Sequence, residues 1–144
     1  MTNLIEIIGE NNHRISFSDP VYREDGYLSF YTVEITAFGL RAELKIENSA
    51  YGDDPSNFFE ELSEFRNGWE GVKDIQIGSG DLIMRAKCDL SGHITLGAKL
   101  STGYSPPSWD VEIMLQVELG KIDALSGKFN AFFRQASNRV AGGI

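Results

Sequence analysis

The chain has few of the residue types from which disulfides and metal centres are built. Its 144 residues include one cysteine and two histidines. A single cysteine cannot form a disulfide within the chain, and we expect Cys88 to be a buried, unreactive thiol inside a strand. His13 and His93 lie outside any HExxH or Cys/His pattern, so the sequence gives no support for a transition-metal site. We therefore expect neither a metal nor another cofactor.

Long apolar runs are also missing. No stretch approaches the roughly 18 apolar residues of a membrane-spanning helix, and the first residues lack the basic start and apolar core of a signal peptide. These absences lead us to expect a cytoplasmic protein without a membrane partner. The length predicts a single domain over residues 1–144, with a frayed tail at Val140–Ile144.

Basic charge is scarce. With 21 acidic residues against 13 Lys and Arg, the formal net charge is −8, which argues against binding to nucleic acids or to an anionic membrane. Between residues 51 and 74, seven acidic residues stand against two basic ones; the acidic residues are Asp53, Asp54, Glu60, Glu61, Glu64, Glu70 and Asp74. Such a run is typical of a solvated helix face, and it also suits the docking of a basic partner.

Catalytic motifs are absent as well. There is no GxSxG elbow, and Gly78–Gly80 is too short for a phosphate-binding loop and precedes a strand. Asp89 and His93 flank a tight turn, where such a pair more often stabilises the turn than binds a metal. Asp110 and Glu112 share the outward side of a strand about 7 Å apart, a spacing that suits acid–base chemistry but also an ordinary solvated face. We predict a protein that is not an enzyme.

Strand patterns are abundant. Apolar and polar residues alternate, or β-branched and aromatic residues gather, in eight segments: Leu4–Ile8, His13–Ser18, Tyr27–Thr36, Leu40–Glu47, Val72–Ile77, Asp81–Asp89, Ile94–Leu100 and Trp109–Leu119. We expect Pro20 to end the second of these strands, because proline disfavours continuation of a sheet.

Two segments have helical periodicity. Asp54 is the expected N-cap of the first helix, Pro55 suits its first position, and the helix is predicted to end near Gly68. The second helix, after Gly120, carries one continuous apolar stripe made of Ile122, Leu125, Phe129, Phe132 and Phe133. The pattern as a whole predicts an α+β fold, with a mainly antiparallel, curved sheet of about seven to eight strands and two helices packed against it.

The loop Ser101–Ser108, which leads into Trp109, is the most suggestive polar and aromatic segment. Tyr104 and Trp109 have rigid side chains that are typical of recognition surfaces. Trp109 also begins the apolar side of a strand, and this position favours a core residue beside a loop that Pro106 and Pro107 stiffen.

Several motifs follow one another in a distinctive order. DLIMRAKCDLSGHITL (81–96) is followed by PPSW (106–109), by an alternating strand, and by a helix that ends in FNAFF (129–133), while GYLSFYTVEITAFG (26–39) precedes them. In this order the chain resembles the WapI-like immunity protein family. It is also similar to a related family of small bacterial proteins of unknown function.

The resemblance implies a cytoplasmic immunity protein that binds and neutralises the toxic domain of a bacterial polymorphic toxin and has no catalytic residues. From the acidic segment and the 101–108 loop we predict a set of partner-binding residues: Asp53, Asp54, Glu60, Glu61, Glu64, Tyr104 and Trp109. The acidic residues would steer a basic toxin toward the protein. The alternative is an interaction module or small-ligand-binding module with a pocket beneath the 101–108 loop.

Overall fold

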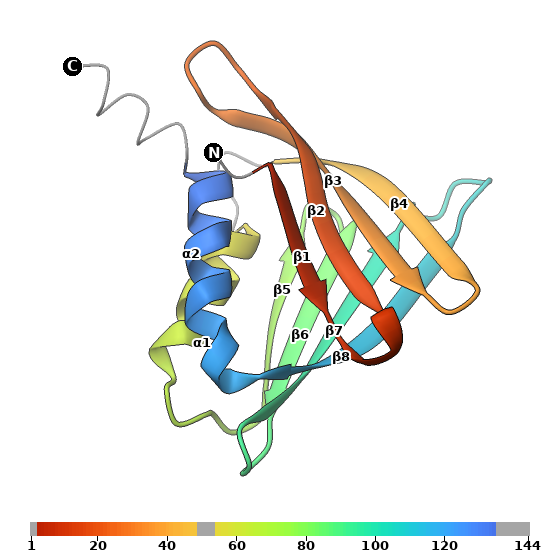
Figure 1. Ribbon diagram of the computed structural model, residues 1–144. Helices are drawn as coiled ribbons and strands as arrows, with labels where there is room; N and C mark the ends of the chain where they lie inside the picture. Colours follow the sequence, from red (N-terminus) through yellow and green to blue (C-terminus); the bar gives the residue numbers. More distant parts are fainter. Residues whose placement is uncertain (1–2, 49–53, 135–144) are drawn as a thin grey trace.

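The computed structural model describes residues 3–48 and 54–134. These residues form eight strands and two α-helices, so the predicted α+β class, the antiparallel pairing and the number of strands are confirmed. The strands do not form one curved sheet. They form two four-stranded sheets, and within each sheet every strand pairs with its neighbours in the chain (Figure 1). The predicted tail at Val140–Ile144 lies outside the described residues.

The elements follow the predicted order. The first sheet contains β1 (Leu4–Ile8), β2 (Arg14–Tyr22), β3 (Leu28–Ala37) and β4 (Leu40–Glu47). Helix α1 (Pro55–Glu64) comes next, and the second sheet contains β5 (Val72–Ile77), β6 (Leu82–Cys88), β7 (His93–Ser101) and β8 (Asp110–Glu118). Two short 3-10 turns, η1 (Glu10–Asn12) and η2 (Leu119–Lys121), precede β2 and helix α2 (Ile122–Phe133), respectively.

Strand β2 continues past the proline in its sequence. Asp19 has a φ angle of 50°, and the pairing of β2 with β3 shifts register between Ser18 and Val21. Pro20 therefore lies in an irregular part of the ladder, where a missing N–H group is tolerated. The prediction that Pro20 ends the strand is wrong for this reason.

Helix α1 begins as predicted and ends early. The Asp54 carboxylate accepts hydrogen bonds from the backbone N–H groups of Ser56 and Asn57, which confirms it as the N-cap. The helix ends at Glu64 rather than near Gly68, because Phe65 leaves the helical region with φ −97° and ψ 69°. The Phe65 ring instead packs edge-on against Trp69, with ring centroids 6.4 Å apart.

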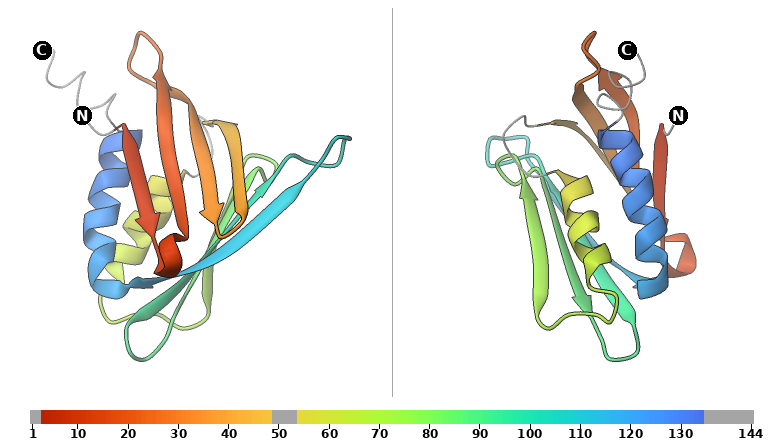
Figure 2. Two further views of the ribbon diagram at one scale, coloured as in Figure 1. Left: turned by 45° about the vertical axis from the view of Figure 1, so that its right-hand side comes forward. Right: turned by 90° about the vertical axis from the view of Figure 1, so that its left-hand side faces the viewer.

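One core lies between the two sheets and the two helices. The helices lie side by side and fill the side on which the sheets diverge (Figures 1 and 2). Four aromatic rings meet where these elements converge, one from each of β2, β3, α1 and α2: Phe17, Tyr31, Phe59 and Phe129. The rings of Phe59 and Phe129 stack at 4.4 Å, and Phe17 packs edge-on against Phe129 at 4.8 Å. All four side chains are fully buried.

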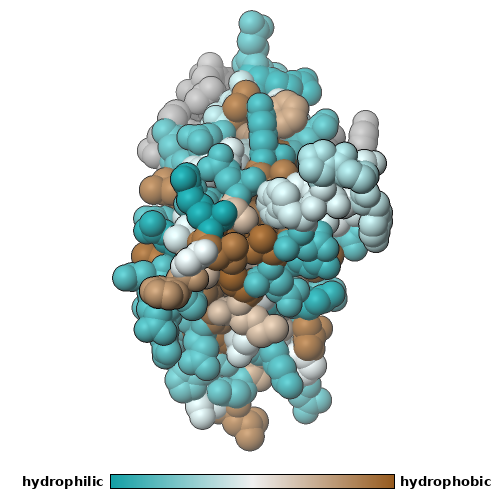
Figure 3. All heavy atoms as spheres, turned by 90° about the vertical axis from the view of Figure 1, so that its right-hand side faces the viewer, coloured by the Kyte–Doolittle hydropathy of each residue, from teal (hydrophilic) through white to brown (hydrophobic). Residues whose placement is uncertain are grey.

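The side of the molecule that carries β4 and β8 is closed less completely. Leu44 of β4 and Val111 of β8 pack against the core and remain only partly buried. Figure 3 shows apolar atoms gathered in the middle of this side, surrounded by hydrophilic ones. Leu40, which alternation places on the core side of β4, is 37% exposed, so the core does not reach the beginning of that strand.

The Tyr31 hydroxyl gives a direct test of this core. Tyr31 is 0% exposed, and its hydroxyl has no hydrogen-bond partner in the part of the chain that the structure describes. Burial, followed by the negative charges of Asp54 and Asp81, raises the pKa of Tyr31 well above its usual range. Because a buried, unsatisfied hydroxyl is costly, Tyr31→Phe is expected to raise the free energy of unfolding by about 1 kcal/mol in urea titrations.

Tyr22→Phe is the matched control. The Tyr22 hydroxyl donates a hydrogen bond of 2.8 Å to the carbonyl oxygen of Phe132, so its removal is expected to lower stability by about 1 kcal/mol. A loss of stability in both variants would contradict the account of Tyr31.

Candidate functional site

The second sheet has one buried and one open face. Twelve of its inward side chains belong to the core: Ile75, Ile77, Leu82, Met84, Ala86, Ile94, Leu96, Ala98, Leu100, Ile113, Leu115 and Val117. The residues between them point the other way, because side chains alternate across a strand. Both helices pack into the core on the inner side, which leaves the outward face of β5–β8 open to solvent.

Strand pairing arranges the outward side chains of this face in rows. In the middle row, Arg85 of β6 lies opposite Gly97 of β7, which lies opposite Met114 of β8. The row on one side consists of Lys87, Thr95 and Gln116, and the row on the other side consists of Ile83, Lys99 and Glu112. Successive rows are about 6.7 Å apart, the rise of two strand residues.

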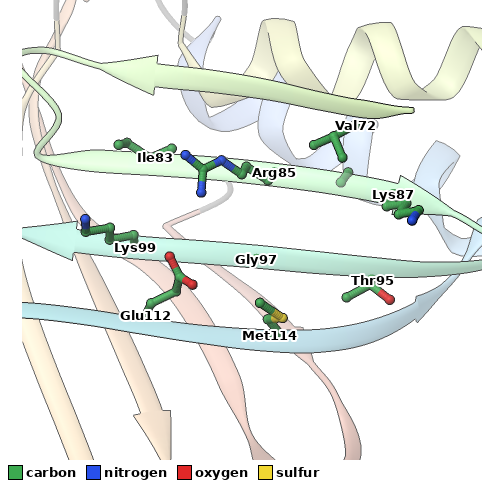
Figure 4. A pocket seen from close by; sticks show the side chains of 10 residues that line it. Val72, Ile83, Arg85, Lys87, Thr95, Gly97, Lys99, Glu112 and Met114 are labelled. Carbon is green, nitrogen blue, oxygen red and sulfur yellow. The ribbon is translucent and has the colours of Figure 1, made fainter. Parts of the chain in front are cut away.

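A groove of about 270 Å³ lies over these rows (Figure 4). Gly97 forms part of its floor, and a Cβ added there would meet no atom closer than 3.9 Å. Val72 and Met114 line the groove and are 57% and 65% exposed, and the apolar side chain of Ile83 lines it as well. Glycine weakens a strand interior and often marks the close approach of a ligand or another chain. This surface, called the sheet groove below, is the candidate binding site.

The sheet groove carries positive charge along its centre. Arg85, Lys87 and Lys99 line it, and within residues 3–48 and 54–134 none of the three forms an ion pair. Asp74 of β5 lies opposite Arg85, and Glu112 of β8 lies opposite Lys99. The cations are therefore on the two central strands, and carboxylates flank them on the two edge strands.

A larger and more polar hollow of about 640 Å³ adjoins the sheet groove. Ile83 and Lys99 line both, and the hollow continues to the loop between β7 and β8. Its other polar lining residues are Gln76, Ser79, Asp81, Ser101, Tyr104, Ser108 and Asp110. A hollow thus lies where a pocket beneath the 101–108 loop is predicted.

Trp109 is not a core residue, contrary to the expectation from strand alternation. It is 37% exposed and lines the polar hollow. The pairing of β7 with β8 ends at Ser101 and Asp110, so Trp109 lies beyond the sheet and beyond the core that the sheet covers. Its backbone N–H donates a hydrogen bond of 2.9 Å to Oγ1 of Thr102. Tyr104, in the same loop, is fully exposed.

The predicted acidic residues lie on another part of the surface. Glu60, Glu61 and Glu64 are exposed on α1, and Glu61 forms an ion pair of 3.3 Å with Lys73 of β5. Asp54 is 8% exposed and is occupied as the helix cap, which leaves little of it for a partner. Asp53 lies outside the described residues. The predicted residues are therefore divided between α1 and the β7–β8 loop.

The turn between β6 and β7 explains the Asp89 and His93 pair. The Asp89 carboxylate accepts hydrogen bonds from the backbone N–H groups of Ser91 and His93, at 2.8 and 2.9 Å. The imidazole of His93 lies between carboxylates, with Nδ1 3.5 Å from Asp89 and Nε2 3.4 Å from Glu118. No group of three or more His, Cys, Asp and Glu side chains in the described residues is arranged to hold a metal ion. The neighbouring Cys88 is only partly buried.

Comparison with known families assigns the chain to one of them. The model of a family of unknown function, DUF6228, matches residues 6–136. The chain belongs to this family. The DUF6228 match spans both sheets and both helices, so the fold described here is that of the family's matching region.

Other comparisons add little. No curated protein matches the chain. A similar solved structure, titled "Structure of the plant transcriptional regulator PBF-2", is 9% identical over 98% of this chain and 88% of that chain, with a TM-score of 0.48. Values this low support no conclusion about this DUF6228 protein. No helix in the described residues is long and apolar enough to cross a membrane.

The sheet groove is the site that the sequence prediction misses. Ile83 and Met114 occupy outward positions in strands whose other outward residues are mostly polar, and Gly97 interrupts a central strand. These three irregularities lie in different strands, and only the strand register shows that they meet. A search for apolar residues on the polar side of a strand would have found two of them.

The turn at Asp89 predicts a pH-dependent contribution to stability. The backbone N–H of His93, followed by that of Ser91, lowers the pKa of Asp89. The ionised Asp89 carboxylate therefore stabilises the fold fully above its unfolded-state pKa of about 3.9. This stabilisation is lost as the pH falls through the lower folded-state pKa. Asp89→Ala is expected to lower the Tm at pH 7, by an amount that shrinks as the pH falls below about 4.

Thermal denaturation between pH 7 and pH 3 measures this effect. Asp89→Asn serves as the control, because the asparagine side-chain oxygen still accepts the two backbone hydrogen bonds. At pH 7 its Tm should fall by less than that of Asp89→Ala. A difference in Tm between Asp89→Ala and the wild type that stays constant across this range would contradict the assignment.

Proposed function

We propose that this protein is a non-enzymatic immunity protein that binds and neutralises a cognate bacterial toxin domain in the cytoplasm. The observation that carries the proposal is the sheet groove, where apolar side chains and three cations, none of them in an ion pair within the described residues, surround a glycine on an open sheet face. The order of motifs in residues 26–133, which resembles that of WapI-like immunity proteins, also supports it.

The sheet groove suits tight binding for two physical reasons. Its side chains project from paired strands of a four-stranded sheet, so little backbone conformational entropy is lost when a partner docks. It is also lined by an arginine, a methionine and aliphatic groups. Arginine and methionine are typical of the centre of a protein interface. A toxin whose active site is covered by such a surface would be excluded from its substrate.

Co-expression tests the proposal. Cells that express a toxin-like protein from the neighbouring gene should recover growth when the immunity protein is present, and the two proteins should be recovered as a complex. Gly97→Val is expected to abolish this rescue, because the added side chain fills the groove. The variant should still fold, since its Cβ meets no atom closer than 3.9 Å and valine favours strands.

Gly127→Val is the matched control. Gly127 is exposed on α2, with no atom within 4 Å of an added Cβ, so the same side chain is added away from the sheet groove and rescue should persist. Failure of the wild-type protein to form a complex would overturn the proposed function. Full rescue by folded Gly97→Val would show that the toxin binds elsewhere.

The carboxylates of α1 give a second prediction. If the toxin is basic, Glu60, Glu61 and Glu64 accelerate its approach, and replacing all three with lysine should slow association about tenfold at low salt. The only described ion pair removed is the exposed one with Lys73, which contributes little to stability. Stopped-flow mixing at low and high salt measures the association rate.

Three exposed acids of the first half of the chain, Glu10, Glu24 and Glu47, provide the control. Their replacement with lysine changes the net charge equally and should slow association less. An association rate at low salt that is unchanged by the α1 substitutions would rule out this role for the helix.

The polar hollow favours a second candidate function, a small-ligand-binding module. Its volume of about 640 Å³ lies in the range of ligand pockets, and Trp109 contributes an aromatic surface beside several polar groups. A ligand bound there would change the fluorescence of Trp109 and would lose affinity in Trp109→Ala. Growth rescue that is unaffected by Trp109→Ala would separate this role from toxin binding.

A further inference from the structure

The three cations of the sheet groove follow a regular spacing. Arg85 and Lys87 lie two residues apart on β6, and Lys99 of β7 pairs with Ile83, which lies two residues before Arg85 on β6. Each step of two residues advances about 6.7 Å along a strand. The cations therefore occupy three successive rows of the sheet and are equally spaced along the strand direction.

An extended polypeptide has the same repeat. Its alternate side chains point to one side and recur at about 6.7 Å, so carboxylates at every second residue would come level with Lys87, Arg85 and Lys99 in turn. We propose that the sheet groove binds an extended acidic segment of the partner protein, with carboxylates at alternate residues. This inference deepens the proposed function and rests on it, because it names the chemistry of the partner at that site.

The form of the sheet groove agrees with this occupant. Gly97 lies beside Arg85 in the middle row, and its missing side chain lets a second backbone approach the sheet closely. Ile83 of β6 and Met114 of β8 also line the groove and offer apolar surface to the methylene groups of glutamate side chains. Figure 4 shows the three cationic side chains around the sheet groove.

The flanking carboxylates fix the position of the segment. Asp74 on β5 and Glu112 on β8 are in the rows of Arg85 and Lys99 but form no ion pair with them. They would repel an acidic segment that shifts toward either edge of the sheet. The segment is therefore held over β6 and β7.

A second copy of this chain fits the sheet groove less well. A two-fold contact centred on the groove would place the cations of β6 and β7 against those of the other copy. The exposed carboxylates of α1 are at positions 60, 61 and 64 of a helix, so they do not repeat at alternate residues of an extended strand.

Fluorescence anisotropy with labelled peptides tests the proposal on the intact protein. The probes are a heptapeptide of alternating serine and glutamate and a second heptapeptide of the same composition whose three glutamates are contiguous. The alternating peptide should bind more tightly, and 0.5 M NaCl should weaken its binding because the contacts are between exposed charges.

A pair of double variants locates the site. Lys87→Gln with Lys99→Gln should weaken binding of the alternating peptide about fivefold, the effect of two exposed charge contacts. Lys121→Gln with Lys128→Gln removes the same charge from exposed positions beside and on α2. This variant should bind the alternating peptide with an affinity within about twofold of the wild-type value.

Several results would overturn the proposal: no binding of the alternating peptide, equal affinity for the two peptides, or equal effects of the two double variants. Tighter binding of a seven-nucleotide thymidine strand would assign the groove to nucleic acid instead. A dimer that dissociates in Gly97→Val, seen by analytical ultracentrifugation, would assign it to a second copy. Growth rescue that persists while the peptide fails to bind would leave the proposed function standing and remove this inference alone.

Discussion

The stacking of Phe59 on Phe129 is the contact on which the rest of the structure depends. It joins the two helices at a ring distance of 4.4 Å, and Phe129 also receives the edge of Phe17 from the first sheet. The inner faces of both sheets share one core with these rings. Since aromatic rings bury large apolar areas, the cluster fixes where the helices lie, and the outward face of β5–β8 remains open as a consequence.

Charge is distributed so that two different surfaces are available to a partner. Acidic side chains dominate α1, whereas cations without ion partners in the described chain line the central strands of the second sheet. A protein of net charge −8 attracts basic molecules at long range, and a local cationic groove selects for carboxylates at short range. A single partner that carries both kinds of charge would be oriented by this arrangement before any apolar contact forms.

Local patterns predicted most of the fold because strands, turns and caps depend on neighbouring residues. The bounds of β1, β4 and β5 and the cap at Asp54 are those predicted. The division into two sheets was missed, because alternation gives the buried side of a strand but not the sheet to which it belongs. The sheet groove was missed for a similar reason, since Gly97, Arg85 and Met114 are adjacent only through register. Trp109 was misplaced because alternation does not show where the core ends.

The pairing of every strand with its chain neighbours has a consequence for folding. The six strand pairs within the described residues are all sequential and antiparallel, so each sheet can assemble from hairpins whose closure costs little loop entropy. The core closes only when α2 docks, because Phe129, Phe132 and Phe133 all lie on this helix. On the ribosome, the apolar inner faces of both sheets therefore remain incompletely covered until residues 122–133 emerge. During this interval the exposed apolar side chains are open to aggregation and to chaperones.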